Sequence, residues 1–162
     1  MTHPFTPDHV QRILDGFGLG LRVDHYDDTT FTSADAARAI GCELGQIAKS
    51  VCLMVGERPV LVVASGDVRI SDAKIAKRFG IGRKKVKIAT PEQCVALFGY
   101  PPGGVAPVGH RSDDVTVIVD ASLGRWDTVH AAAGTSHDNF TLTFEQLCRI
   151  TGGEVCDCAK DG

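Results

Sequence analysis

The chain has 162 residues, which is most simply one domain, residues 1–162, large enough to bury a core. Apolar residues make up 43% and charged residues 23%, as is ordinary for a globular protein, and no apolar run approaches the length of a membrane span. The N-terminus lacks a basic and apolar signal segment, so the sequence predicts a cytoplasmic protein with no membrane partner.

Up to residue 89 the pattern alternates between helices and strands. Apolar residues at helical spacing mark each helix, often with a capping serine and a closing glycine, and apolar or alternating runs mark each strand. Gly56-Glu57-Arg58 joins two such runs and is typical of a β-hairpin. The predicted elements are, in chain order, a helix over 7–18, a strand over 21–26, a helix over 33–40 capped by Ser33, strands over 50–55 and 59–64, a helix up to 79 capped by Ser71, and a strand over 85–89.

The second half begins with a helix that opens at Thr90-Pro-Glu-Gln93, a capping box with proline at the first helical position. A glycine- and proline-rich loop over 99–110 follows. Strands are then predicted over 115–120, 128–133 and 140–142, and a last helix opens at the capping box 143–146 and ends at Gly152-Gly153. Hairpins mixed with helices indicate an α/β chain with a mixed sheet.

Six cysteines raise the question of disulfides or metal. Cys52 and Cys94 fall within apolar stretches and are predicted to be small buried side chains. Cys148, Cys156 and Cys158 lack the paired C-x-x-C spacing of a zinc site, so we expect free thiols and no metal or other cofactor.

Charge is unevenly distributed along the chain. Residues 69–87 carry eight basic side chains against Asp72 alone, a local charge of +7 that leaves −10 for the rest of a chain of net charge −3. Such segregation is typical either of a solvated face or of a surface that contacts a phosphate backbone. The basic residues are Arg69, Lys74, Lys77, Arg78, Arg83, Lys84, Lys85 and Lys87.

The loop over 99–110 is the most informative segment. Its glycines and prolines set its path through backbone constraints, so it is either a connector or a rigid loop that aims N–H groups at a ligand. Residues 103–106 each carry an N–H group and Pro107 does not. A row of this kind suits an oxyanion better than a metal ion.

Two other segments carry polar groups beside apolar strands. Lys49 precedes an apolar run, where its ammonium either extends off the strand end into solvent or holds a phosphate or hydroxyl group in a pocket. Residues 130–138 change from small to polar, as suits a pocket wall. His130 is predicted to be packed and hydrogen-bonded, and His137 and Asp138 are better site candidates. A metal site at these three residues is an alternative, with no convincing further ligand.

Five segments in this order resemble the YbaK/ProX family of aminoacyl-tRNA deacylases, which is related to the editing domain inserted in bacterial prolyl-tRNA synthetases. The resemblance covers roughly residues 25–153, and five motifs in order are far more specific than any one of them. Ser50 stands where relatives often carry Thr or Asn, which leaves the amino acid removed open. The segments are 48–51 (Ala-Lys-Ser-Val), 63–74, 87–93, 99–109 and 133–138.

The resemblance implies a single editing domain of α+β type, with a mixed, mostly antiparallel central sheet of about six or more strands flanked by helices. It also implies hydrolysis of the ester that joins a wrong amino acid to tRNA, such as alanyl- or cysteinyl-tRNA for proline, with help from a ribose hydroxyl of the substrate. Prolyl-tRNA synthetase is an expected partner and DNA is not. The alternatives are a non-catalytic module that binds tRNA or a synthetase, and a metal-dependent hydrolase.

The resemblance also assigns roles to residues of this chain. Lys49 would position the 3′ end of the substrate, and the loop residues would surround the ester carbonyl and donate N–H groups to the oxyanion. Ser50, Gly134, His137 and Asp138 would bind the substrate and shape the amino-acid pocket. The loop residues are Gly103, Gly104, Val105, Ala106 and Pro107, and the expected tRNA contacts are Lys77, Arg78, Arg83, Lys84 and Lys85.

Overall fold

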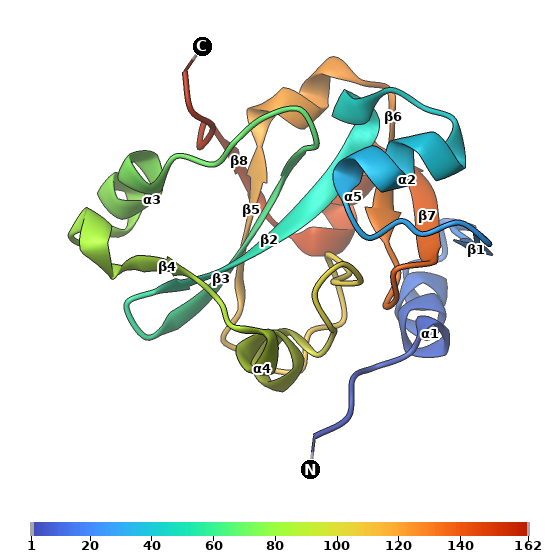
Figure 1. Ribbon diagram of the computed structural model, residues 1–162, viewed down its shortest axis with the longest axis horizontal. Helices are drawn as coiled ribbons and strands as arrows, with labels where there is room; N and C mark the ends of the chain where they lie inside the picture. Colours follow the sequence, from blue (N-terminus) through green and yellow to red (C-terminus); the bar gives the residue numbers. More distant parts are fainter. Residues whose placement is uncertain (1, 162) are drawn as a thin grey trace.

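The longest hairpin of the chain lies at the centre of the sheet. Strands β2 (Ile47–Val55) and β3 (Arg58–Ser65) pair antiparallel from Ala48–Ser65 to Val55–Arg58 around the turn at Gly56, as the sequence predicts. The computed structural model describes residues 2–161, and in that part of the chain one sheet contains eight strands (Figure 1). The order is β1-β7-β6-β2-β3-β5-β8, and β4 also pairs with β2.

The sheet is mixed, and the antiparallel pairs are the more numerous. β2 pairs antiparallel with β3 and β4, and β7 pairs antiparallel with β1 and β6. The parallel pairs are β2 with β6, β3 with β5, and β5 with β8. This confirms the predicted mixed, mostly antiparallel sheet of six or more strands. The remaining strands are β1 (Val23–His25), β4 (Val86–Ile88), β5 (Thr116–Asp120), β6 (Thr128–Ala132), β7 (Asp138–Thr143) and β8 (Glu154–Cys156).

One edge of β2 is shared by two strands that diverge from it. Its first residues, Ile47 and Ala48, pair with β6, whereas Leu53–Val55 pair with β4. Residues 49–52 therefore border a gap between β6 and β4, which we call the fork of β2. Pairing is limited to the two ends of this edge because β4 is short and is followed at once by the segment that leads into residues 99–110.

Apolar side chains fill the space on both faces of the sheet. Leu61 and Val63 belong to one cluster, with Leu14 of α1 and Leu147 of α5, and Val62 belongs to the other, with Ile75 of α3. Burial on both faces explains the continuous apolar run of β3. The α-helices are α1 (Pro7–Phe17), α2 (Ser33–Ile40), α3 (Asp72–Phe79), α4 (Pro91–Gln93) and α5 (Phe144–Thr151), and none of those within residues 2–161 has the length and apolar character to cross a bilayer.

Three local predictions need correction. The side chain of Thr32, rather than Ser33, caps α2 by accepting a hydrogen bond from the Asp35 N–H at 3.0 Å. The helix after Thr90 is α-helical only over α4 and continues as a π-helix, Cys94–Phe98. The sequence analysis places no element after Gly153, whereas the structure has strand β8, which is only three residues long and pairs non-locally with β5.

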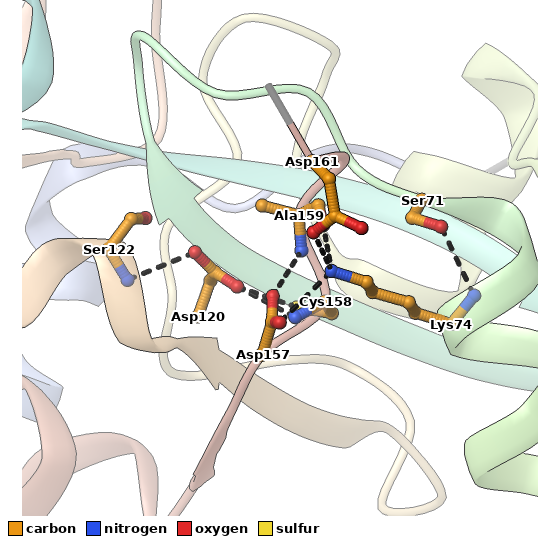
Figure 2. A network of polar contacts seen from close by, with 8 residues as sticks. All are labelled: Ser71, Lys74, Asp120, Ser122, Asp157, Cys158, Ala159 and Asp161. Carbon is orange, nitrogen blue, oxygen red and sulfur yellow. Dashed lines mark hydrogen bonds and ion pairs between the residues drawn. The ribbon is translucent and has the colours of Figure 1, made fainter.

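The C-terminal segment after β8 is fastened to α3 and β5 by polar contacts (Figure 2). The buried carboxylate of Asp120 accepts hydrogen bonds from the backbone N–H groups of Ser122 at 3.0 Å and Cys158 at 2.8 Å. Burial works against the charged form, but these bonds hold the pKa of Asp120 below its usual value. On the surface, the Lys74 ammonium donates to the carboxylates of Asp157 and Asp161.

Candidate functional site

A cavity of about 130 Å³ lies at the fork of β2. Lys49 and Ser50 line it from β2, and Gly103 and Val105 line it from the glycine- and proline-rich loop. Thr30 and Phe31, which precede α2, and Ala132 and Asn139, from β6 and β7, also line it. The structure thus brings four of the residues predicted to form the site to one cavity.

The backbone of β2 offers hydrogen-bonding groups at this cavity. The Cys52 carbonyl accepts from the Ala89 N–H at 2.9 Å, on the β4 side of the strand, and Ala48 pairs with β6 on the same side. Backbone groups of alternate residues in a strand point to the same side. Those of Ser50 therefore point into the fork, where neither β6 nor β4 pairs with them.

Three buried polar atoms of the cavity wall have no hydrogen-bond partner in the part of the chain that the structure describes: Thr30 Oγ1, Ser50 Oγ and Asn139 Nδ2. Thr30 and Asn139 are each only 4% exposed. Buried polar groups in native proteins nearly always have partners. Thr30, Ser50 and Asn139 therefore bring three unsatisfied polar groups close to one small cavity, although each of these atoms has less than 1 Å² of accessible surface.

Lys49 is the only charged residue that lines the cavity within residues 2–161. Its half-buried ammonium donates a hydrogen bond to the Val68 carbonyl. Burial lowers the pKa of Lys49, and the nearby Arg69 lowers it further, whereas Asp67 works in the opposite direction. The ammonium therefore stands in a less hydrated setting than a surface lysine, where it interacts more strongly with a polar substrate group.

The glycines of the loop allow two close backbone approaches. Gly103 has a φ of +84°, and a Cβ on it would lie 2.4 Å from the Phe31 ring. A Cβ on Gly104 would lie 2.7 Å from the Thr135 nitrogen, and the Gly104 carbonyl accepts a hydrogen bond from the Gly134 N–H at 2.8 Å. Residues 103–104 are therefore held between the segment before α2 and the segment after β6.

Buried side chains hold the rest of this loop in place. The hydroxyl of Tyr100, a fully buried residue, donates to the Val108 carbonyl at 2.6 Å, and the His110 ring bonds the Ala106 carbonyl through Nε2 at 2.9 Å. Burial lowers the pKa of His110, although its bond to Ala106 works in the opposite direction. Residues 99–110 therefore form a packed wall and not a loose connector.

The predicted row of four N–H groups is interrupted. The Gly104 N–H donates to the Pro101 carbonyl at 3.0 Å and is not available to a substrate. Ala106 and Pro107 are buried, and Gly103 and Val105 are the loop residues that line the cavity. One of the four N–H groups that the sequence predicts to face a ligand is therefore used in a hydrogen bond within the loop.

Gly134, His137 and Asp138 lie behind the loop and not on the cavity wall. The Asp138 carboxylate accepts from the Thr135 hydroxyl at 2.5 Å and contacts His25 Nδ1 at 3.0 Å. His137 Nδ1 lies 3.0 Å from the Tyr26 carbonyl oxygen. These contacts fix the segment whose Gly134 bonds Gly104, so any role in substrate binding is indirect in this arrangement.

His130 is packed and hydrogen-bonded, as predicted. Its Nδ1 lies 2.9 Å from the Thr141 hydroxyl, directly across the β6–β7 pair, and burial lowers its pKa. Within residues 2–161, no three His, Cys, Asp or Glu side chains are grouped as metal ligands, and all six cysteines are free.

Sequence reasoning missed Thr30, Phe31 and Asn139. They come from the segment before α2 and from β7, and only the folded sheet brings them to β2. Asn139 immediately follows Asp138, which the sequence does mark as a candidate. Because successive side chains of a strand point to opposite faces, the sequence could have placed the Asn139 side chain on the face opposite to that of Asp138.

The basic segment is partly neutralised by neighbouring carboxylates. Arg78 pairs with Glu154 at 2.5 Å and Lys74 with two aspartates of the C-terminal segment. Lys77 is exposed, as are Arg83, Lys84 and Lys85, and none of these four makes an ion pair with the described residues.

A groove adjoins the cavity on the side of β4. β4 follows the basic residues directly, and its Ile88 lines a groove of about 370 Å³ whose wall includes Ser50, Gly103 and Val105 of the cavity. Ile88 is 78% exposed, so this groove is open to a large partner.

Comparison with known proteins agrees with this geometry. Residues 27–150 match the family model of the aminoacyl-tRNA editing domain. The chain belongs to this family. The structure of this editing domain is similar to a crystal structure of a candidate trans-editing enzyme for prolyl-tRNA synthetase. The TM-score is 0.87, and the sequences are 34% identical over 96% of this chain and 97% of that one.

Two relatives by sequence contain a segment similar to the editing domain. It is 33% identical to the uncharacterized protein YwhH of Bacillus subtilis, over 86% of this chain and 87% of that protein. It is also 33% identical to the proline–tRNA ligase of Thiobacillus denitrificans, over 57% of this chain but only 16% of the ligase. The predicted relationship to a domain within prolyl-tRNA synthetases is confirmed.

Proposed function

We propose that this editing domain hydrolyses the ester bond of mischarged aminoacyl-tRNA as a separate enzyme acting in trans. The observation that carries the proposal is the convergence of Lys49 with Gly103 and Val105 of the glycine- and proline-rich loop on one small cavity. A cavity of about 130 Å³ suits a small acyl group, and the adjoining groove includes Ile88, which directly follows the basic segment whose exposed side chains would contact the tRNA backbone.

Hydrolysis requires little from the protein beyond orientation and charge stabilisation, because an aminoacyl ester is intrinsically labile. Water adds to the ester carbonyl carbon and gives up one proton, which leaves a tetrahedral oxyanion. This intermediate then collapses, releasing the amino acid, while the departing ribose oxygen takes up a proton. N–H groups of Gly103 and Val105 and the Lys49 ammonium are the donors proposed to stabilise the oxyanion and hold the 3′ end.

The proposed mechanism uses no protein nucleophile. Ser50 is the one hydroxyl of β2 on the cavity wall, and its Oγ has no base among its described neighbours. No His, Asp or Glu of the described residues lines the cavity. A serine without an adjacent base is a weak nucleophile. We therefore assign water activation to a ribose hydroxyl of the substrate, as the resemblance implies.

Alanyl- and cysteinyl-tRNA for proline are the first substrates to test, with prolyl-tRNA synthetase as the proposed partner in the cytoplasm. The test compares ester loss with the wild-type protein, Lys49→Ala and a matched control, Lys160→Ala, whose exposed side chain lies outside the cavity. We expect Lys49→Ala to lose about 100-fold or more in kcat/KM and the control to lose nothing.

Undiminished hydrolysis by Lys49→Ala would refute the role of this lysine. Saturable tRNA binding without turnover of any mischarged tRNA would instead support a non-catalytic binding module.

A further inference from the structure

The segment that leads into α1 contacts both ends of the glycine- and proline-rich loop. The Phe5 N–H donates to the Gly99 carbonyl at 2.7 Å. At the other end of the loop, His9 Nε2 lies 2.9 Å from the Gly109 carbonyl oxygen, and because a carbonyl only accepts, Nε2 is the donor of this bond. Residues 3–9, which we call the N-terminal strap, therefore connect the two ends of a loop whose middle lines the cavity.

The strap lies close against the loop at both contacts because the loop has glycine at each. A Cβ on Gly99 would lie 2.6 Å from the Phe5 ring, and a Cβ on Gly109 would lie 2.9 Å from His9 Nε2. The Phe5 and His9 rings stack on each other with 3.9 Å between their centroids. The buried ring of Tyr100 meets the Phe5 ring edge-on at 6.0 Å. The two contacts are thus parts of one packed aromatic unit.

Arg111 fastens the strap from the segment directly after the loop. Its guanidinium lies over the Phe5 ring, 4.2 Å from the centroid, and donates to the His3 carbonyl. Its Nε donates to the Val95 carbonyl at 3.2 Å, in the π-helix before the loop. No carboxylate within residues 2–161 pairs with Arg111. Its contacts therefore join the strap to the element from which the loop begins.

We propose that the N-terminal strap positions the glycine- and proline-rich loop for deacylation, with Phe5, His9 and Arg111 as positioning residues. The inference rests on the proposed function, in which this loop donates N–H groups to the oxyanion. None of these three residues lines the cavity, so each acts through the loop and not on the substrate. The strap also lies outside residues 27–150, which match the family model.

Truncation of Phe5 tests the catalytic consequence. Phe5→Ala removes the ring that lies between His9 and Arg111, so the loop is less firmly placed and we expect kcat on mischarged tRNA to fall about 10-fold or more. The KM should change less than about 2-fold, because the side chains proposed to contact the tRNA belong to α3 and the turn after it. Both constants are measured well below the Tm of every variant.

Phe17→Ala is the matched control. Phe17 lies at the other end of α1 and, like Phe5, is partly buried against the same core cluster. Its truncation should lower the Tm and leave kcat unchanged. Equal losses of kcat in Phe5→Ala and Phe17→Ala would show that activity follows stability alone, which overturns the positioning role.

The hydrogen bond from His9 is tested by a pair of variants. His9→Leu removes the donor to Gly109 and should lower kcat about 5-fold. His9→Gln restores an N–H donor on a side chain of similar reach and should recover most of the loss. Equal losses in the two variants would overturn the role of this bond.

Phe5 and Arg111 act as one unit, so their effects should not add. Arg111→Met should lower kcat about as much as Phe5→Ala, and the double variant should lose no more than the stronger single variant. Independent, multiplying losses would mean that Arg111 does not act through the strap.

Hydrogen exchange gives a readout that does not depend on activity. In Phe5→Ala the amides of residues 99–110 should exchange about 10-fold faster than in the wild type, whereas those of α2 should not change. Unchanged exchange and unchanged kcat in Phe5→Ala, beside an active wild type, overturn the positioning role and leave the deacylase intact. A wild-type protein that hydrolyses no mischarged tRNA overturns the proposed function, and the catalytic role of the strap with it.

Discussion

Gly104→Ala should separate the packing of the loop from the rest of the fold. An added Cβ would lie 2.7 Å from the Thr135 nitrogen and 2.8 Å from the carbonyl carbon and oxygen of Gly134. These are backbone atoms, so the two segments must move apart. Overpacking of this kind costs about 1–3 kcal/mol, and loss of the Gly134-to-Gly104 hydrogen bond adds about 1 kcal/mol.

The expected destabilisation of about 2–4 kcal/mol corresponds to a decrease in Tm of roughly 5–15 °C for a domain of this size. Displacing residues 103–105 by about 1 Å should also reduce deacylation about 100-fold. Thermal melts and deacylation kinetics measure the two effects.

Gly16→Ala is the matched control, because its Cβ would meet no atom within 4 Å and Gly16 lies in the last turn of α1. Since alanine is the better helix former, Gly16→Ala should raise stability by about 0.5–1 kcal/mol and leave the activity unchanged. A Gly104→Ala protein with wild-type Tm and activity would refute the close packing of these two segments.

Three further predictions concern charge and protonation. Replacing Arg83, Lys84 and Lys85 together by Gln should make the affinity for tRNA less dependent on salt. The slope of log affinity against log salt concentration should decrease by about 0.7–0.9 for each phosphate that the variant no longer neutralises. An unchanged slope would mean that these three side chains are solvated and do not contact phosphates. Burial lowers the pKa of His130, so the folded state binds its proton less readily than the unfolded chain, and stability is lost as the pH falls below about 6.5. His130→Gln should therefore make Tm less dependent on pH between about 6.5 and 5, a range in which carboxylates contribute little to the pH dependence. If the variant lost Tm with falling pH as steeply as the wild type, this reasoning would be wrong. Asp120→Ala leaves two backbone N–H groups unpaired and should lower the free energy of unfolding, measured with denaturant, by about 2–4 kcal/mol. Lys74→Met should lower it much less, because the aspartate partners of Lys74 are exposed.

Local patterns in the sequence are sufficient to predict most elements of this fold. Each helix begins at a residue whose side chain satisfies the first N–H groups or at a proline, and several end at a glycine with positive φ, such as Gly18 and Gly80. These signals are local, so they need no knowledge of the sheet. The capping boxes at Thr90 and Thr143 are both present in the structure. The predicted cap of α2 lies one residue too late because Ser33 is, in isolation, at least as good a cap as Thr32.

Non-local pairing explains what sequence reasoning could not supply. β8 joins the sheet through a parallel pair with β5, and Asp120 anchors the segment behind it through a bond to Cys158, 38 residues away. The cavity wall depends on pairings of the same kind, because Asn139 reaches β2 only through β6. Motifs identified Lys49 and the glycine loop, whereas the residues that complete the cavity have no motif of their own.

The fork of β2 connects these observations. A strand edge with unpaired backbone groups is normally covered by another strand, by a loop or by a partner. Here β6 and β4 cover its two ends, and the rigid loop stands across the gap with Gly103 and Val105 facing the same cavity as Ser50. The cavity and the groove share Ser50, Gly103 and Val105, so an acyl group and the chain to which it is attached would meet at those residues. Under the proposed function, deacylation at the fork would depend on the rigidity of the loop as well as on Lys49, since the loop would determine where the ester carbonyl lies relative to that lysine.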